Sequence, residues 1–209
     1  KLFVSTKNSG RQNQNVIVVR TGLDGADQVF IDPNAVDPKG PTSFGLMGAS
    51  KDDRYMAVSV QKAGSDQQDI TLWDLQTMKP LADTLHWTKF SGVAWYKEGF
   101  FYSRFPAPAK GMELKAASLD QKVYYHKVGD PQSKDVLVWK SNDDPNLYVS
   151  VETTEGEEFA TIEVTTGTDG WEESFFDLRK GGIPNPASKW TSLQQGFDHH
   201  TSIIAFEPK

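Results

Sequence analysis

The sequence repeats a loose unit of short strand-like segments, and this repeat limits the possible folds more than any other feature. The unit is about fifty residues long. It opens with a turn carrying acidic residues or glycine and continues into an apolar strand, at residues 50–57, 96–102 and 154–160. An aromatic strand with a polar tail follows, at residues 72–75, 124–128 and 175–178. A last short strand ends each unit, at residues 81–85, 135–139 and 189–193. A repeat of this length built from short strands is typical of the four-stranded blade of a β-propeller.

The apolar residues follow the pattern of short β-strands throughout the chain. Nine runs are β-branched or aromatic and are bounded by turn residues, at 2–4, 16–19, 55–60, 70–73, 100–102, 123–125, 136–139, 147–149 and 159–162. The 17 Gly and 11 Pro fall mostly between these runs, where turns require them. The best helix candidate, residues 112–119, is short and lies in a connection that contains Pro and Lys. The sequence therefore predicts an all-β fold.

Each blade has two apolar faces and can bury them only against neighbouring blades. We expect blades at roughly residues 1–41, 42–89, 90–145 and 146–198, with the start of another at 199–209. About three of these are complete four-stranded units, whereas a closed propeller needs roughly four to eight blades. The chain also starts without Met or a signal segment and stops just after an apolar run. We therefore expect an incomplete propeller, a fragment of a larger protein, whose exposed flanks pack against another copy or against further parts of its own chain.

Composition excludes several functions. The net charge of −6 argues against a general nucleic-acid binder, which needs Lys and Arg to neutralise phosphates. No apolar run is long enough to predict a membrane span. The absence of Cys excludes a disulfide scaffold, thiolate metal ligands and a cysteine nucleophile. Composition does not decide the compartment, and both the cytoplasm and the bacterial periplasm stay open.

The sequence contains no recognisable catalytic serine. A hydrolase-fold nucleophile needs a Gly-x-Ser-x-Gly turn, and no such pentapeptide occurs. The nearest segment, residues 40–45, has one residue too many and a Pro in the turn, so we interpret Ser43 as part of a loop entering a strand. We therefore predict no catalytic residue in this chain.

The histidines and carboxylates also have structural explanations. His199 and His200 are adjacent on an expected strand and point to opposite faces, so we predict no metal site and no cofactor. His86 and His126 stand among aromatic residues, and we expect them to fill space between blades with a ring nitrogen bonded to the backbone. The acidic runs at residues 143–145 and 155–158 are expected at turns and sheet edges.

A series of segments in fixed order and spacing resembles the prolyl oligopeptidase family of serine peptidases. These segments lie at residues 12–16, 22–25, 29–34, 64–66, 89–95, 100–106 and 121–129. The likeness is specific over roughly the first 140 residues, and beyond Gly167 it thins to the blade pattern.

The resemblance implies a two-domain enzyme. Members of this family pair a seven-bladed propeller with an α/β-hydrolase domain that cuts short peptides after proline, and the propeller caps the active site and excludes folded proteins. The present chain would cover about the first half of the propeller and none of the hydrolase domain. Its expected partners are a proline-containing oligopeptide, the remaining blades and the hydrolase domain, while the fragment itself is predicted to be inactive.

Only the resemblance to this family predicts residues that contact the substrate, and it predicts two. Periodicity indicates that Phe90 opens a strand and is buried. The resemblance instead implies that Phe90 helps line a pocket for substrate residues upstream of the proline. Asp66 matches a family position at the domain interface, where the resemblance implies that it could pair with a cation or steer the amino end of the substrate. In the family an aromatic residue comes directly after this Asp, whereas this sequence has Gln67 there.

Without the resemblance, two other interpretations are possible. The repeats alone favour a stand-alone propeller-like module that binds proteins and has no enzymatic activity. A closed β-sandwich or lectin-like domain is the other, and the fifty-residue period argues against it.

Overall fold

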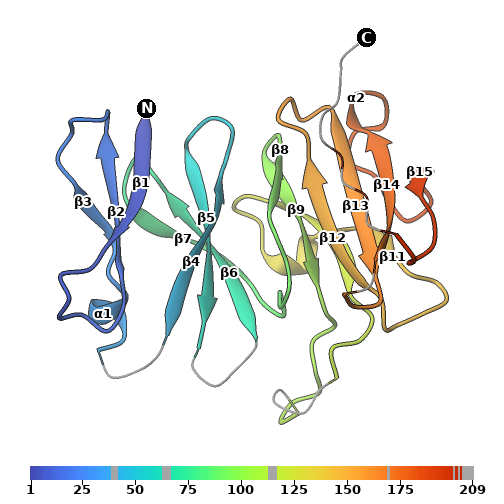
Figure 1. The fold of residues 1–209 in the computed structure, drawn as a ribbon, viewed down its shortest axis with the longest axis horizontal. Helices are drawn as coiled ribbons and strands as arrows, with labels where there is room; N and C mark the ends of the chain where they lie inside the picture. Colours follow the sequence, from blue (N-terminus) through green and yellow to red (C-terminus); the bar gives the residue numbers. More distant parts are fainter. Residues whose placement is uncertain are drawn as a thin grey trace. The chain divides into compact units, whose positions relative to one another are not determined.

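The computed structural model describes residues 1–38, 42–62, 67–112, 117–168, 170–199, 201 and 203. The chain forms two compact units, Lys1–Leu81 and Ala82–Lys209. The described residues form four separate sheets, and in each sheet the strands follow one another in chain order (Figure 1). This meander arrangement suits a sequence in which short strands alternate with glycine- and proline-rich turns.

The first unit contains a three-stranded antiparallel sheet and most of a four-stranded one. The strands of the first sheet are β1 (Leu2–Lys7), β2 (Val16–Thr21) and β3 (Gln28–Ile31). Those of the second sheet are β4 (Ser43–Ala49), β5 (Tyr55–Gln61), β6 (Gln68–Asp74) and β7 (Lys79–Leu85), the last of which continues into the second unit. Buried side chains of both sheets form one hydrophobic core, including Ile17, Val19, Phe30, Met56 and Val58.

The second unit contains two four-stranded antiparallel sheets. The first consists of β8 (Ala94–Tyr96), β9 (Gly99–Arg104), β10 (Lys122–Lys127) and β11 (Val136–Lys140). The second consists of β12 (Tyr148–Thr153), β13 (Phe159–Thr165), β14 (Trp171–Asp177) and β15 (Thr191–Gln194). β12 packs against β8, β9 and β10, and the two sheets share a core that includes Phe101, Val123, Val138, Val151 and Ile162.

The register of the last sheet separates an apolar face from a polar one. Side chains alternate between the two faces of a strand, and paired residues share a face. The core face carries Val149, Val151, Ala160, Ile162 and Val164. The other face carries Tyr148 and Ser150 from β12, Glu163 and Thr165 from β13, and Trp171 and Glu173 from β14. This second face forms part of the site described below.

The predicted strands are confirmed, and the short helices were not foreseen. All nine predicted runs lie within strands, except that the run at 147–149 starts one residue before β12. The helix candidate at 112–119 is not tested, because residues 113–116 lie outside the described residues. The helices α1 (Pro33–Val36) and α2 (Leu178–Gly181) and the 3-10 turn η1 (Gln132–Lys134) are new. An aspartate caps the N-terminus of each α-helix. The Asp32 carboxylate accepts a hydrogen bond from the Asn34 amide, and the Asp177 carboxylate accepts one from the Arg179 amide.

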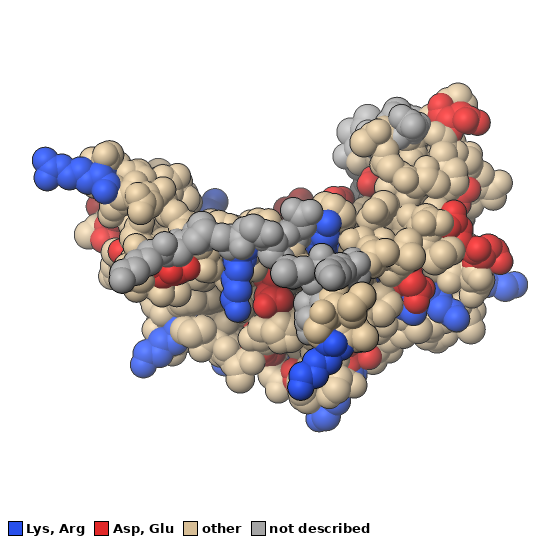
Figure 2. All heavy atoms as spheres, turned by 90° about the horizontal axis from the view of Figure 1, so that it is seen from below, with Lys and Arg blue, Asp and Glu red and all other residues tan. Residues whose placement is uncertain are grey.

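Charges of both signs lie on the face drawn in Figure 2, and the helices of the described residues are short. On the face drawn in Figure 2, Lys and Arg side chains are interspersed with Asp and Glu, and the described residues there form no continuous basic stripe. Across the described ranges, no helix has the length and hydropathy needed to cross a membrane. The blade limits given above stay a prediction.

Candidate functional site

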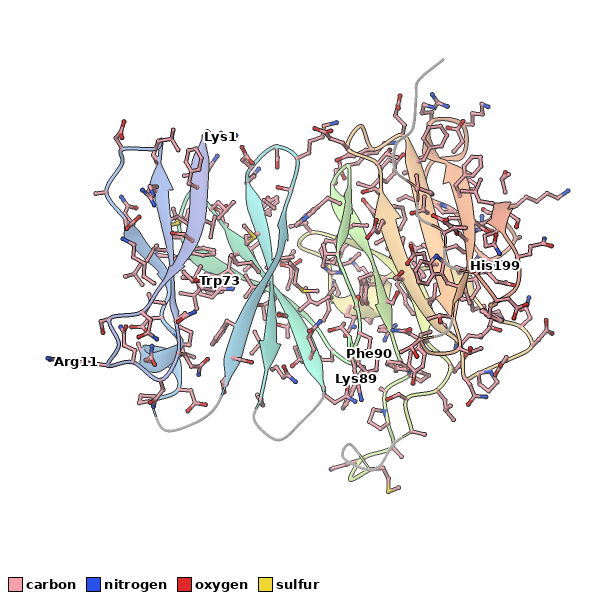
Figure 3. The ribbon with its side chains drawn as sticks, in the orientation of Figure 1. Lys1, Arg11, Trp73, Lys89, Phe90 and His199 are labelled. Atoms are coloured by element: carbon pink, nitrogen blue, oxygen red, sulfur yellow. The ribbon has the colours of Figure 1, made fainter. Side chains whose placement is uncertain are left out.

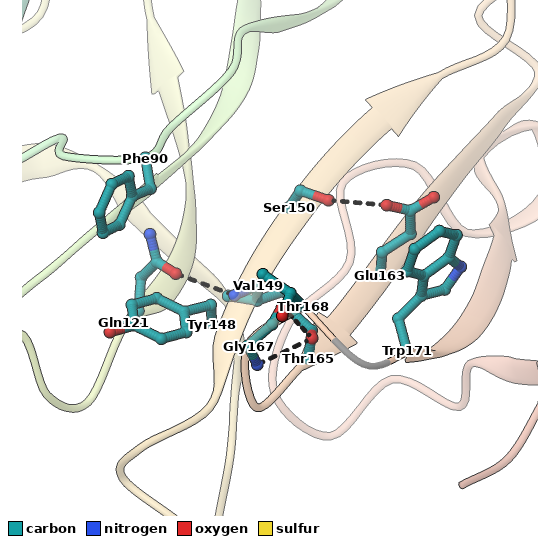
Figure 4. A pocket seen from close by; sticks show the side chains of 10 residues that line it. All are labelled: Phe90, Gln121, Tyr148, Val149, Ser150, Glu163, Thr165, Gly167, Thr168 and Trp171. Atoms are coloured by element: carbon teal, nitrogen blue, oxygen red, sulfur yellow. Dashed lines mark hydrogen bonds between the residues drawn. The ribbon is translucent and has the colours of Figure 1, made fainter. Parts of the chain in front are cut away.

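A cavity of about 500 Å³ opens in the second unit. Its wall combines three aromatic side chains with a few polar groups and includes Phe90, Gln121, Tyr148, Ser150, Glu163 and Trp171. Phe90 and Tyr148 lie at one side of the cavity and Glu163 and Trp171 at the other (Figure 4). A mostly apolar hollow with few polar groups is the common form of a small-ligand or peptide site.

Phe90 presents its ring to this cavity from a turn, not from a strand. The turn at Lys89 and Phe90 precedes β8, which begins only at Ala94 (Figure 3). Phe90 has φ 61°, a left-handed conformation that is costly for a bulky residue, and the residue is 62% exposed. The prediction that Phe90 opens a strand and lies in the core is therefore wrong. The lining position implied by the resemblance agrees with where the ring lies, but substrate contact stays a prediction.

Ring contacts fix the aromatic side of the cavity. The rings of Phe90 and Tyr148 meet edge to face with centroids 5.7 Å apart, and Tyr148 meets Phe105 in the same way at 6.2 Å. The ammonium group of Lys89 lies 4.7 Å from the centroid of the Phe90 ring. Edge-to-face packing and this cation–π contact hold Phe90 in place although most of its surface is exposed.

Gln121 ties the Phe90 turn to the last sheet. Its side chain is almost fully buried, and Nε2 donates a hydrogen bond to the Lys89 carbonyl oxygen at 3.3 Å. Oε1 accepts a hydrogen bond from the Val149 amide at 2.8 Å. Because Lys89 precedes Phe90 and Val149 follows Tyr148, a single amide group sets the spacing of both rings. Sequence reasoning missed this role, since nothing local to Gln121 indicates partners about thirty residues away on either side.

Glu163 is the charged group of the opposite side. Its Oε2 accepts a hydrogen bond from the Ser150 hydroxyl at 3.4 Å, as the dashed line in Figure 4 shows. Burial raises the pKa of Glu163, and repulsion from Glu152 and Glu173 raises it further, while the Ser150 hydrogen bond opposes the shift. Glu163 was not singled out from the sequence.

A second polar cluster lies around His126. This side chain is 0% exposed; Nδ1 is 2.7 Å from Asp135 Oδ1, and Nε2 is 3.0 Å from Asp83 Oδ1. Burial disfavours the charged ring, but the two carboxylates outweigh it and raise the pKa of His126 to about 9. The Tyr102 hydroxyl donates to Asp135 Oδ2 at 2.5 Å. His126 fills buried space as predicted, but the expected backbone hydrogen bond is wrong because carboxylates bind both ring nitrogens. His86 is exposed, so its predicted space-filling role is wrong.

The other predicted residues lie outside the described part of the chain, at exposed positions, or at turns. Asp66 and His200 lie outside the described residues, so the role of Asp66 stays a prediction. His199 is exposed, and Ser43 is the exposed first residue of β4, as its interpretation at a strand entry predicted. The acidic runs at 143–145 and 155–158 lie in or beside turns and bends as predicted. Within the described ranges, no group of three or more His, Asp or Glu could hold a metal ion.

The family of the chain follows from its match to known proteins. A family model described as the prolyl oligopeptidase N-terminal beta-propeller domain matches residues 2–207. The chain belongs to this family. Prolyl endopeptidases from Elizabethkingia meningoseptica and Elizabethkingia miricola are 33% and 36% identical, each over 95% of this chain and 27% of the relative. The chain therefore spans about a quarter of the length of these curated relatives.

Solved structures agree with this assignment. A structure from a study of two prolyl endopeptidases has a TM-score of 0.79 and 29% identity, covering 94% of this chain and 27% of that chain. Prolyl oligopeptidase B from Galerina marginata, bound to a 35mer substrate, has a TM-score of 0.84. It is 24% identical and covers 99% of this chain and 32% of that chain, so this likeness concerns the fold alone. The predicted family and fold class are confirmed: the chain is an all-β propeller segment, and none of the four sheets formed by its described residues is closed.

Proposed function

We propose that this chain is the substrate-gating propeller segment of a serine peptidase that cleaves short peptides after proline. Its cavity would receive peptide residues upstream of the proline. Membership of the prolyl oligopeptidase propeller family supports the reaction class. The exposed ring of Phe90 at the cavity supports the location, since an aromatic ring held in a left-handed turn and kept out of the core is positioned for contact with a ligand.

Acyl transfer in this proposal belongs to a hydrolase domain outside the 209 residues. The sequence contains no Gly-x-Ser-x-Gly turn. We therefore expect the 209-residue chain alone to leave a fluorogenic Gly-Pro peptide intact. Turnover that a serine-directed reagent abolishes, and that labelling traces to this polypeptide, would contradict this division.

The peptide site is tested by replacing Phe90 with alanine in the full-length protein. With a fluorogenic peptide that carries residues upstream of Gly-Pro, we expect Phe90→Ala to raise KM about tenfold, because the substrate loses an aromatic contact. With a peptide truncated to Gly-Pro, KM should change little. Leu23→Ala is the matched control, because Leu23 is 72% exposed in the first unit. Equal KM for wild type and Phe90→Ala on the longer peptide would contradict the proposed site.

A further inference from the structure

Glu163 is the one acidic or basic side chain among the described residues that line the cavity. It lies on the polar face of the last sheet, on the same face as Tyr148 and Trp171. Trp171 is two residues before Glu173, the direct cross-strand partner of Glu163, so the indole is a diagonal neighbour of the carboxylate. A carboxylate beside an indole ring favours a cation, through charge attraction and cation–π contact together.

The charge of Glu163 is not neutralised within the described part of the chain. No Lys or Arg among these residues forms an ion pair with it, and its polar contact is the Ser150 hydroxyl. The ammonium group of Lys89 lies over the ring of Phe90, and this ring is at the other side of the cavity. Glu152 and Glu173, on the two strands that flank β13, add negative charge and raise the pKa of Glu163. A bound cation would relieve this repulsion.

We propose that Glu163 makes this cavity select peptides with a positively charged side chain, lysine or arginine, upstream of the proline. This inference depends on the proposed function, because it takes the cavity as the peptide site. Tyr148 and Phe90 would contact the apolar part of the peptide, while the ammonium or guanidinium group would lie between Glu163 and Trp171. Glu163 is half-buried, so its attraction to such a charge is screened less than at a fully exposed site.

The test uses the full-length protein and N-acetylated fluorogenic peptides ending in Gly-Pro. Lysine, norleucine or glutamate is placed in turn at each of three upstream positions. Norleucine matches the length of the lysine stem without its charge. At one position we expect kcat/KM for lysine to exceed that for norleucine about fivefold, the size of a partly exposed ion pair. In Glu163→Gln this ratio should fall to about one, and the glutamate peptide should improve.

Control variants separate a charge effect from a structural one. Glu152→Gln removes a carboxylate from the same sheet face outside the cavity lining and should keep the preference for lysine. Glu163→Asp keeps the negative charge and should therefore keep part of the preference for lysine. In Glu152→Gln the kcat/KM for the norleucine peptide should stay within about twofold of the wild-type value. Folding of the two Glu163 variants is checked by urea unfolding, whose midpoint should match that of the wild type.

The outcomes distinguish this inference from the proposed function. Cleavage after proline with equal rates for lysine and norleucine at every position would overturn the inference and leave the function intact. A loss in Glu163→Gln that is equal for all three peptides would also overturn it, because it would mean that Glu163 supports the fold only. Absence of any cleavage after proline would overturn both.

Discussion

Replacing His126 with glutamine removes the side chain that bridges two buried carboxylates. In the folded protein both ring nitrogens contact Asp83 and Asp135, and the ring has no exposed surface. Without the imidazolium the two carboxylates would face each other with their charges uncompensated. A buried charge left without its partner typically costs about 3–5 kcal/mol. We expect His126→Gln to reduce the free energy of unfolding by about 3 kcal/mol at pH 6.

The pH dependence follows from the raised pKa of His126. Its pKa is about 9 in the folded protein against 6.5 for an ordinary histidine, a difference that corresponds to about 3 kcal/mol. Because the folded pKa lies above the unfolded one, protonation stabilises the folded state fully below pH 6.5. This stabilisation declines as the pH rises towards 9 and is lost above it. In His126→Gln the contribution is absent at every pH.

Urea unfolding followed by tryptophan fluorescence between pH 6 and 9.5 tests this reasoning. The difference in unfolding free energy between wild type and His126→Gln should be largest at pH 6 and should shrink by about 3 kcal/mol by pH 9.5. His86→Gln is the matched control, because His86 is exposed, and it should follow the wild-type curve. A difference that is constant with pH would show that His126 is neutral when folded and would refute the argument.

Three further substitutions test the packing and hydrogen bonds of the sheets by urea unfolding. Gln121→Met should lower the free energy of unfolding by about 1–3 kcal/mol, because it leaves the buried Val149 amide without its acceptor. The same substitution should raise KM for peptides by displacing the Phe90 turn. An unchanged KM would count against the role of Gln121 in positioning Phe90. Gly99→Ala should cost more than about 2 kcal/mol, since its Cβ would overlap a carbonyl oxygen of β10; a neutral effect would contradict the β9–β10 geometry. Leu72→Ala should cost about 2–5 kcal/mol because Leu72 is fully buried; a cost below about 1 kcal/mol would show that the site is not a packed core.

The strands could be predicted because their signal is local. Runs such as residues 55–60 and 159–162 combine β-branched side chains with flanking turn residues, and their shortness also favours a strand over a helix. Helix α1 also had a local signal, an aspartate cap followed by Pro33 at the first helical position, but four residues are too few to form a helical period.

The site was less predictable because its geometry depends on distant parts of the chain. Phe90 precedes an apolar run, and periodicity predicts that it belongs to the strand, whereas the left-handed turn ends before β8 and leaves the residue exposed. The partners of His126 lie 43 residues before it and 9 residues after it, so aromatic neighbours in sequence gave the wrong hydrogen-bond partner. The polar face that carries Glu163 depends on the register of three strands, which a single sequence does not determine.

The most direct test of the central claim is a crystal structure of the full-length protein with a non-cleavable proline-containing peptide bound. We expect a peptide residue upstream of the proline to lie within about 4 Å of the Phe90 and Tyr148 rings. A peptide bound elsewhere, with these two rings covered by other parts of the protein, would contradict the account.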